Sequence, residues 1–203
     1  MTSSTERRRR HRAAPPRRWA RTDATQQRIL DAATEVFGAH GFTAATMADI
    51  VVASGASIGS IYHHFGGKKE LFLAIFERMS ADTYQRISEA GAQTSGAHRQ
   101  AAFEVNTRAY LQAMWANRRV VLVLASGDVP AGFDQIRRRR MLSDFGRWLS
   151  LLDLDAAPRD RLLRRILVDV MAESALMVAR CKHETDAEPI VDATIEYIAR
   201  LTG

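Results

Sequence analysis

Apolar residues recur at intervals of three and four along most of this chain, and that spacing constrains the fold more than any other feature. In the segment after Thr25, for example, Ile29, Ala33 and Val36 fall on one side of a helix. No segment shows the alternating pattern of paired strands. The sequence therefore predicts an all-α protein.

Short helices joined by glycine-containing turns are expected in the first third of the chain. The first helix ends at Gly41, and a second begins at Thr46, with Asp49 in its first turn as in a capping box. Gly55 suits a tight turn because it tolerates the left-handed conformation, and Ser57 is placed to cap a third helix. Further helices are expected from about residue 68 and over residues 98–117, 118–127, 131–152, 158–182 and 186–201.

Positive charge is concentrated at the N-terminus. Residues 1–21, here called the arm, hold eight arginines and one glutamate, a net charge of +7, which leaves −1 for the other 182 residues of a chain whose total is +6. Such a segment is usually disordered, and it is either a solvated tail or a DNA contact. No apolar stretch follows it as in a secretory signal, so we expect a cytoplasmic protein.

Composition argues against several other classes of protein. The single cysteine, Cys181, excludes an internal disulfide framework and a cysteine-based zinc cluster. No apolar run is long enough for a membrane span, so no membrane partner is expected. No nucleophile and base are arranged for catalysis and no phosphate-binding glycine loop is present, so we expect neither an enzyme nor a cofactor. Adjacent His63 and His64 point about 100° apart on a helix, which disfavours a metal site.

The third helix has an unusual outward face. Ile61 and Phe65 can pack with Ile50 and Ala53. The opposite side carries four residues, none with a permanent charge: Gly59, Ser60, Tyr62 and His63. A glycine inside a helix costs about 1 kcal/mol relative to alanine, and close approach to a DNA backbone would compensate for it. The alternative is a three-helix packing unit that binds nothing.

A long set of residues between positions 28 and 76 has characteristic spacing. The set comprises Arg28-Ile29-Leu30-Asp31-Ala32-Ala33, Phe37, Gly41-Phe42, Thr46-Met47-Ala48-Asp49-Ile50, Ser54-Gly55, Gly59-Ser60-Ile61-Tyr62-His63-His64-Phe65 and Lys68-Lys69-Glu70-Leu71-Phe72. This pattern resembles the DNA-binding domain of TetR-family transcriptional regulators. The resemblance implies an arm (1–21), a helix-turn-helix head (22–70) and a helical regulatory and dimerisation region (71–203).

The resemblance also implies a function. It implies a dimeric repressor that a small-molecule effector releases from a palindromic operator, although an activator with the same head is an alternative. The DNA-binding residues expected by position are Thr46, Ser57, Ile58, Gly59, Ser60, Tyr62, His63 and Lys68. The threonine, the tyrosine and the lysine would hold phosphates, while the serines and the histidine would lie near base edges. Ile58 would make an apolar contact, for example to a thymine methyl group.

The last two predicted helices offer a dimer surface. Apolar residues in the helix expected over 158–182 alternate in steps of four and three, which is a heptad-like seam. The proposed dimer residues are Leu163, Leu167, Val170, Ser174, Met177, Ile195 and Ile198. The alternative is that this seam packs inside one chain.

An effector cavity would be lined by the middle helices. The candidates are Phe103, Asn106, Tyr110, Met114, Trp115, Leu122, Phe145, Trp148, Met171, Glu173 and Met177. Methionine and aromatic side chains suit an adaptable pocket, but at helical spacing they are more often plain core. Asn106 and Glu173 are the polar members that could orient a ligand. The run Arg137–Arg140 is either a solvated face or an attraction for an acidic effector.

Overall fold

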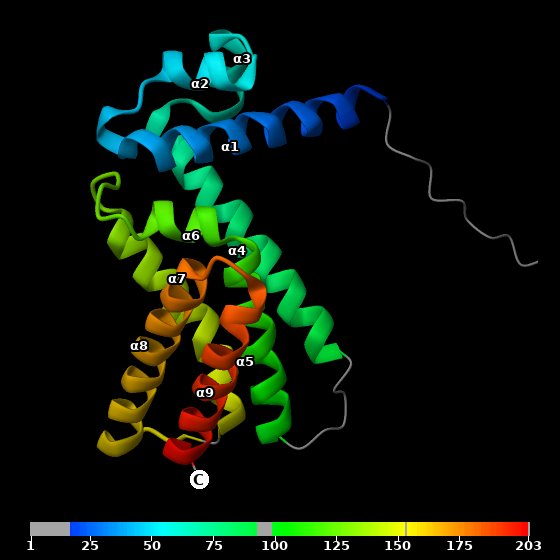
Figure 1. The fold of residues 1–203 in the computed structure, drawn as a ribbon. Coiled ribbons are helices and arrows are strands. Elements are labelled where there is room, and N and C mark those ends of the chain that lie inside the picture. Colours follow the sequence, from blue (N-terminus) through cyan, green and yellow to red (C-terminus); the bar gives the residue numbers. More distant parts are fainter. Residues whose placement is uncertain (1–16, 93–98, 153, 203) are drawn as a thin grey trace, which may run out of the picture.

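The computed structural model describes residues 17–92, 99–152 and 154–202, without the side chains of residues 17–22, 147, 148 and 150. Within these ranges every regular element is helical, which confirms the predicted fold class (Figure 1). The helices are α1 (Arg17–Ala44), α2 (Met47–Ser54), α3 (Ile58–Phe65), α4 (Lys68–Ala92), α5 (Arg99–Ala116), α6 (Arg118–Leu124), α7 (Phe133–Leu149), a 3-10 turn (Ser150–Leu152), α8 (Pro158–Arg180) and α9 (Glu184–Thr202). From α5 onward, their ends agree with the expected ends to within three residues.

Two groups of helices share one long helix. Helices α1–α3, which we call the head, lie at one end of the molecule, and helices α5–α9, the body, form the remainder (Figure 1). Helix α4 begins beside α3 and extends along the body, where it packs against α5. A displacement of α4 inside the body would therefore move the base of the head.

Capping residues explain why α2 and α3 form where they do. The amide of Asp49 donates to Oγ1 of Thr46 at 3.2 Å and the amide of Thr46 donates to Oδ2 of Asp49 at 2.9 Å, so the predicted capping box is present. A hydrogen bond from the Thr46 hydroxyl to Oδ2 of Asp49 at 2.7 Å, and then the bond from the Thr46 amide, hold the pKa of Asp49 below its ordinary value. Gly55 adopts the left-handed conformation that ends α2, and Ser57 caps α3.

Two details of the head differ from the sequence-based expectation. Helix α1 begins at Arg17, so the last five residues of the predicted arm are helical; residues 1–16 lie outside the described part of the chain. Ala53 is exposed, whereas Ser54 is buried with Ile50. Residues four apart lie on the same side of a helix, and the Ser54 hydroxyl is satisfied because it accepts from the amide of Ala56 at 3.2 Å.

A cluster of phenylalanines joins the head to the body. Phe37 and Phe42 of the first helix contact Phe72 of α4, with ring centroids 5.4 Å from it in both cases. Phe72 in turn contacts Phe133 at the start of α7, at 5.1 Å and nearly perpendicular. Both Phe72 and Phe133 are almost completely buried. The hydrophobic core of the head therefore continues into the body without a break.

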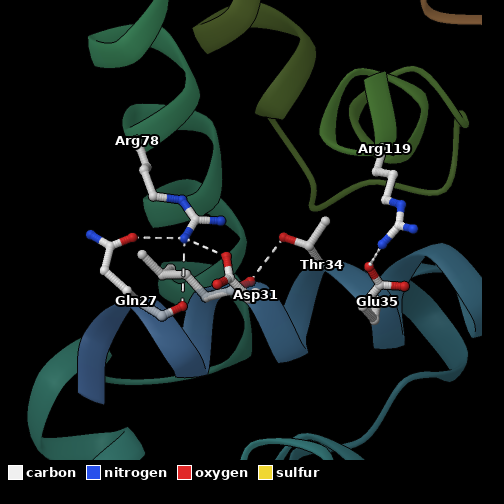
Figure 2. A network of polar contacts seen from close by, with 7 residues as sticks. Gln27, Asp31, Thr34, Glu35, Arg78 and Arg119 are labelled. Carbon is white, nitrogen blue, oxygen red and sulfur yellow. Dashed lines mark hydrogen bonds and ion pairs between the residues drawn. The ribbon is translucent and has the colours of Figure 1, made fainter. Parts of the chain in front are cut away.

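Polar contacts at the surface supplement this core. Nη1 of Arg78 on α4 donates to Oε1 of Gln27 at 2.9 Å and to Oδ1 of Asp31 at 2.7 Å (Figure 2). Arg119 on α6 forms an ion pair with Glu35 of α1 (Figure 2). Each of these pairs has at least one exposed member, so their main effect is on the orientation of α1 rather than on stability.

Candidate nucleic-acid interface and internal cavity

The outward face of α3 is exposed as the helical spacing predicts. Ile58 and Tyr62 retain 46% and 49% of their surface, and Gly59 and His63 are also exposed. Ile61, on the opposite side, is completely buried and anchors the helix to the head core. The exposed face therefore offers hydrogen-bonding groups and one branched apolar side chain, and no carboxylate.

No contact within the described part of the chain explains the glycine at position 59. A Cβ placed on it would meet no atom within 4 Å among the described residues, and Gly59 lies inside a regular helix. Neither packing nor backbone conformation therefore requires glycine here, although it costs about 0.5–1 kcal/mol relative to alanine. A molecule that approaches this backbone from outside would account for it.

The two histidines of α3 point in different directions. Nε2 of Gln26 in α1 lies 3.3 Å from Nδ1 of His64, which attaches that imidazole to the head. The ring of His63 lies 5.3 Å from that of His64, and His63 is exposed on the outward face. No group of three metal-ligating side chains occurs in the described ranges.

Two of the expected phosphate-binding side chains are engaged within the chain. The Thr46 hydroxyl is exposed but takes part in the cap of α2. Nζ of Lys68 donates to the carbonyls of Phe42, Thr43 and Ala45 at 2.8, 3.2 and 2.9 Å.

The geometry of Lys68 revises its expected role. Its ammonium also lies 4.6 Å from the centroid of the Phe42 ring. Lys68 therefore donates to the backbone carbonyls that follow the kink of α1 at Gly41. This arrangement does not agree with the expectation that the ammonium group of Lys68 binds a phosphate. The amides at the start of α4 keep the capacity to bind an anion.

A cavity of about 690 Å³ lies in the body. Helices α4, α5, α7 and α8 contribute most of its lining, which is mainly apolar. Five of the predicted residues line it: Asn106, Tyr110, Met114, Phe145 and Glu173. These five residues come from α5, α7 and α8.

The remaining cavity predictions are not supported by the structure. Five of these residues are absent from the lining: Phe103, Trp115, Leu122, Met171 and Met177. Phe103 and Met171 are buried in the core, whereas Leu122 and Met177 face solvent. Trp115 packs against the cluster around Leu111, and the side chain of Trp148 lies outside the described part.

Sequence analysis missed the contribution of α4 to the cavity. Phe76, Met79, Thr83 and Ile87 follow one another in steps of three and four, and all four line the cavity. The start of this stripe was visible in the sequence, but none of its residues was listed among the cavity candidates. Its continuation through Thr83 and Ile87 was the signal that α4 also serves the body.

The predicted dimer seam lies mostly inside the chain. Leu167 and Ile198 are each 1% exposed and Ser174 is buried, so they cannot form a surface for a second copy. The Thr194 hydroxyl donates to Oγ of Ser174 at 2.9 Å, and this bond fastens α8 to α9.

Of the other predicted dimer residues, three pack against the core and one is exposed. Leu163, Val170 and Ile195 are partly buried, whereas Met177 is exposed. The alternative that the seam packs within one chain is therefore correct for most of its length. Besides Met177, four apolar residues outside the predicted set are exposed on these two helices: Leu162, Ile166, Tyr197 and Leu201.

Two short helices joined by a glycine turn, with the second one exposed, define this chain as a helix-turn-helix protein. Residues 29–75 match the family model described as "Bacterial regulatory proteins, tetR family". The chain therefore contains a segment that matches the DNA-binding domain of the TetR family, as the sequence pattern indicated.

Curated relatives match about a third of the chain or less. The chain is 40% identical over 67 residues to the HTH-type transcriptional repressor AcnR of Corynebacterium efficiens, which is 33% of this chain and 36% of that protein. It is 45% identical over 56 residues to the HTH-type transcriptional regulator SrpR of Pseudomonas putida, 28% of this chain and 26% of that protein. The match thus spans only about a third or less of each relative's own length.

Solved structures resemble the whole fold. A TetR-like transcriptional regulator from Rhodococcus superposes with a TM-score of 0.67 at 24% identity, over 93% of this chain and 96% of its own. A transcriptional regulator from Aquifex aeolicus gives a TM-score of 0.69 at 20% identity, over 87% and 99%. These similarities establish that head and body together have the fold of such regulators. No helix in the described ranges is sufficiently long and apolar to traverse a lipid bilayer.

Proposed function

We propose that this protein is a sequence-specific DNA-binding transcriptional regulator, a dimeric repressor that a small molecule releases from a palindromic operator. The observation that carries the proposal is the outward face of α3. It is exposed and free of carboxylates, and it contains Gly59, for which no contact within the described chain gives a reason.

The side chains of this face suit a groove of DNA. Tyr62 and His63 can donate hydrogen bonds to phosphates, and the Ser60 hydroxyl can reach a base edge. Ile58 adds an apolar contact of the kind that distinguishes thymine by its methyl group. Gly59 allows the helix backbone to lie close to the DNA. The names of the relatives, which are transcriptional repressors and regulators, agree with this proposal.

A palindromic operator requires a two-fold symmetric dimer. We place the dimer surface on the exposed apolar residues of α8 and α9, in place of the buried seam. Leu162, Ile166 and Met177 fall within about 60° of one another on α8. Replacement of Leu162 by Glu should convert the protein to a monomer in sedimentation velocity. Leu142→Glu, at an exposed site on α7, is the matched control and should leave a dimer.

A pair of tyrosine substitutions tests the role of α3. Duplex DNA enriched by the protein from random fragments would serve as the probe in fluorescence anisotropy. Tyr62→Phe should weaken binding roughly tenfold, because a hydrogen bond to a charged phosphate is lost. Tyr197→Phe is the matched control, since Tyr197 is 58% exposed on α9, and it should bind as the wild type does. Equal affinities for the two variants would contradict the proposal.

The rival function is non-specific DNA binding by the arm. Binding of that kind depends on phosphate charge alone, falls steeply with salt and is the same for all sequences. A variant that lacks residues 1–16 separates the two functions. We expect it to bind more weakly but to keep its sequence preference, whereas complete loss would favour the rival.

Release by an effector would act through α4, which lines the cavity and supports the head. An effector shifts the population only if it binds the form with the wrong head spacing more tightly. In the DNA-bound form the two α3 helices should lie about 34–36 Å apart, one turn of DNA. Structures with and without effector that showed the same separation would contradict this mechanism.

A further inference from the structure

The polar atoms of the cavity indicate which chemical class of ligand it accepts. Most of the lining is apolar, so the bulk of any ligand must be apolar as well. Oδ1 of Asn106 and Oγ1 of Thr83 are buried and have no hydrogen-bond partner in the described chain. Both residues line the cavity, one from α5 and one from α4. Since an unpartnered buried polar atom is costly, a ligand that donates hydrogen bonds here would relieve that cost.

The arginines at the cavity are already paired with carboxylates. Nη2 of Arg137 lies 3.2 Å from Oδ1 of Asp134. Arg140 contacts two acids, Asp144 at 3.2 Å and Glu77 at 3.5 Å. An acidic ligand would have to displace these carboxylates or accept their repulsion. The alternative that this arginine run attracts an acidic effector is therefore not favoured.

The remaining acids leave an excess of negative charge. Asp169 lies 3.6 Å from Nε of Arg165, whereas Glu173 has no ion pair or hydrogen bond among the described residues. Among the residues that line the cavity, two arginines therefore face three carboxylates. Glu173 is exposed and also lines the cavity, so it lies where the cavity opens. The net charge of this region favours a cation.

Aromatic rings add to the preference for a cation. Phe76, Tyr84, Tyr110 and Phe145 all line the cavity, and the rings of Tyr110 and Phe145 meet edge to face at 5.1 Å. Burial raises the pKa of the Tyr110 phenol well above its ordinary value, so this side chain stays neutral at physiological pH. Neutral aromatic faces attract organic cations.

We propose that the cavity binds an amphipathic organic cation, an apolar molecule with one protonated amino group. The amino group donates to Oδ1 of Asn106 or to the Glu173 carboxylate, while the apolar part contacts the aromatic wall. This inference rests on the proposed function in one respect only, since it takes the cavity of the body to be the effector site.

A matched series of small molecules tests the inference without DNA. The probes are 6-phenylhexylamine, 6-phenylhexanol and 6-phenylhexanoate, which share an apolar part and differ in charge at neutral pH. In titration calorimetry with the full chain, the amine should bind at least tenfold more tightly than the carboxylate, with the alcohol between them. Equal affinities, tighter binding of the carboxylate or no binding of the amine would overturn the inference.

Three variants test which residues of the cavity determine the affinity for the amine. Glu173→Gln should lower the affinity for the amine at least threefold and leave that for the alcohol unchanged. Glu184→Gln makes the same change of charge at an exposed site outside the cavity and should alter neither affinity. Asn106→Leu removes the buried acceptor and should weaken both donors, the amine and the alcohol; thermal unfolding confirms that each variant is folded. A threefold loss in both glutamate variants would show a general charge effect and overturn the assignment.

Separate readouts distinguish this inference from the proposed function. If the amine binds but DNA affinity does not respond to it, the ligand class stands and the release mechanism fails. If DNA binding is regulated by the carboxylate instead, the function stands and the ligand class fails.

Discussion

The head and the body are both helical, but they differ in how completely their side chains fill the interior. In the head and at the start of α4, Ile29, Ile50, Ile61 and Phe72 are completely buried around one continuous core. The body surrounds a cavity of about 690 Å³ and leaves the buried oxygens of Thr83 and Asn106 without partners. A surface that reads DNA has to be held rigidly, whereas a ligand site has to leave space and polar groups open. The difference in packing therefore parallels the difference in proposed roles.

Contacts at the junction show how one region is oriented on the other. Asp128, between α6 and α7, accepts from the Thr43 hydroxyl at 2.5 Å and from the Thr43 amide at 3.0 Å. A Cβ on Gly41 would collide with Oδ2 of the same aspartate. The junction thus requires a residue without a side chain where α1 is interrupted. It is the point at which the two regions are most sensitive to a small change.

The largest expected effect comes from the aromatic cluster. Phe72→Ala should lower the free energy of unfolding by about 3–5 kcal/mol, because a fully buried ring is removed from the shared core. Phe145→Ala should cost at least about 1 kcal/mol less, since that ring borders an existing cavity and has fewer contacts to lose. Chemical denaturation measures both values. Equal losses would mean that the body is packed as tightly as the head.

The next effect concerns Gly41. Its φ of 76° and ψ of 168° are adopted almost exclusively by glycine, so Gly41→Ala should destabilise the protein by about 1–3 kcal/mol. Gly38→Ala is the control three residues earlier, in regular helix, where the new methyl group would meet Val123 at an ordinary 3.5 Å. That variant should be more stable than the wild type by about 0.5–1 kcal/mol. A reversed order of the two in thermal unfolding would contradict the described junction.

A substitution at Gly59 should change stability and DNA affinity in opposite directions. Gly59→Ala should raise the free energy of unfolding by about 0.5–1 kcal/mol, because nothing within 4 Å in the described chain opposes the methyl group. The same methyl group should weaken DNA binding, since it prevents close approach of the backbone. Denaturation and fluorescence anisotropy on the same preparation test both effects. A variant that gained stability and kept its affinity would remove the main support for the proposed DNA interface.

The smallest effect is a dependence on pH at the junction. Hydrogen bonds from the Thr43 side chain and then from its amide hold the pKa of Asp128 below its ordinary value of 3.8. A carboxylate with a lowered pKa stabilises the fold fully above its unfolded value, and this contribution disappears as the pH falls through the lowered pKa. The stability difference between wild type and Asp128→Ala should therefore be constant from about pH 7 to 5 and shrink below about pH 4. A difference that persisted at about pH 3 would contradict this account.

The head was easier to predict from sequence than the body for a physical reason. The limits of α2 and α3 follow from local chemistry, in which Thr46, Gly55 and Ser57 act on backbone groups a few residues away. The exposed face of α3 then follows from the helical period. Burial of Ala53 was predicted wrongly because neighbouring positions at the edge of an apolar stripe differ little in pattern.

In the body, apolar spacing alone did not distinguish core, cavity and surface. Leu167 and Met177 belong to one heptad-like seam, yet the first is buried and the second is exposed. The cavity also depends on α4, whose stripe through Thr83 and Ile87 continues the core of the head. These assignments require the packing of several helices. By contrast, Asn106 and Glu173 were identified because polar residues stand out in apolar segments.

Selection of bound fragments from random double-stranded DNA, at near-physiological salt, tests the central claim most directly. It should be carried out with the full chain and with the variant that lacks residues 1–16. The account predicts that both enrich the same inverted repeat, with half-site centres about one helical turn apart. No enrichment, together with binding that disappears after a modest increase in salt, would contradict it and leave only the basic arm as a DNA contact.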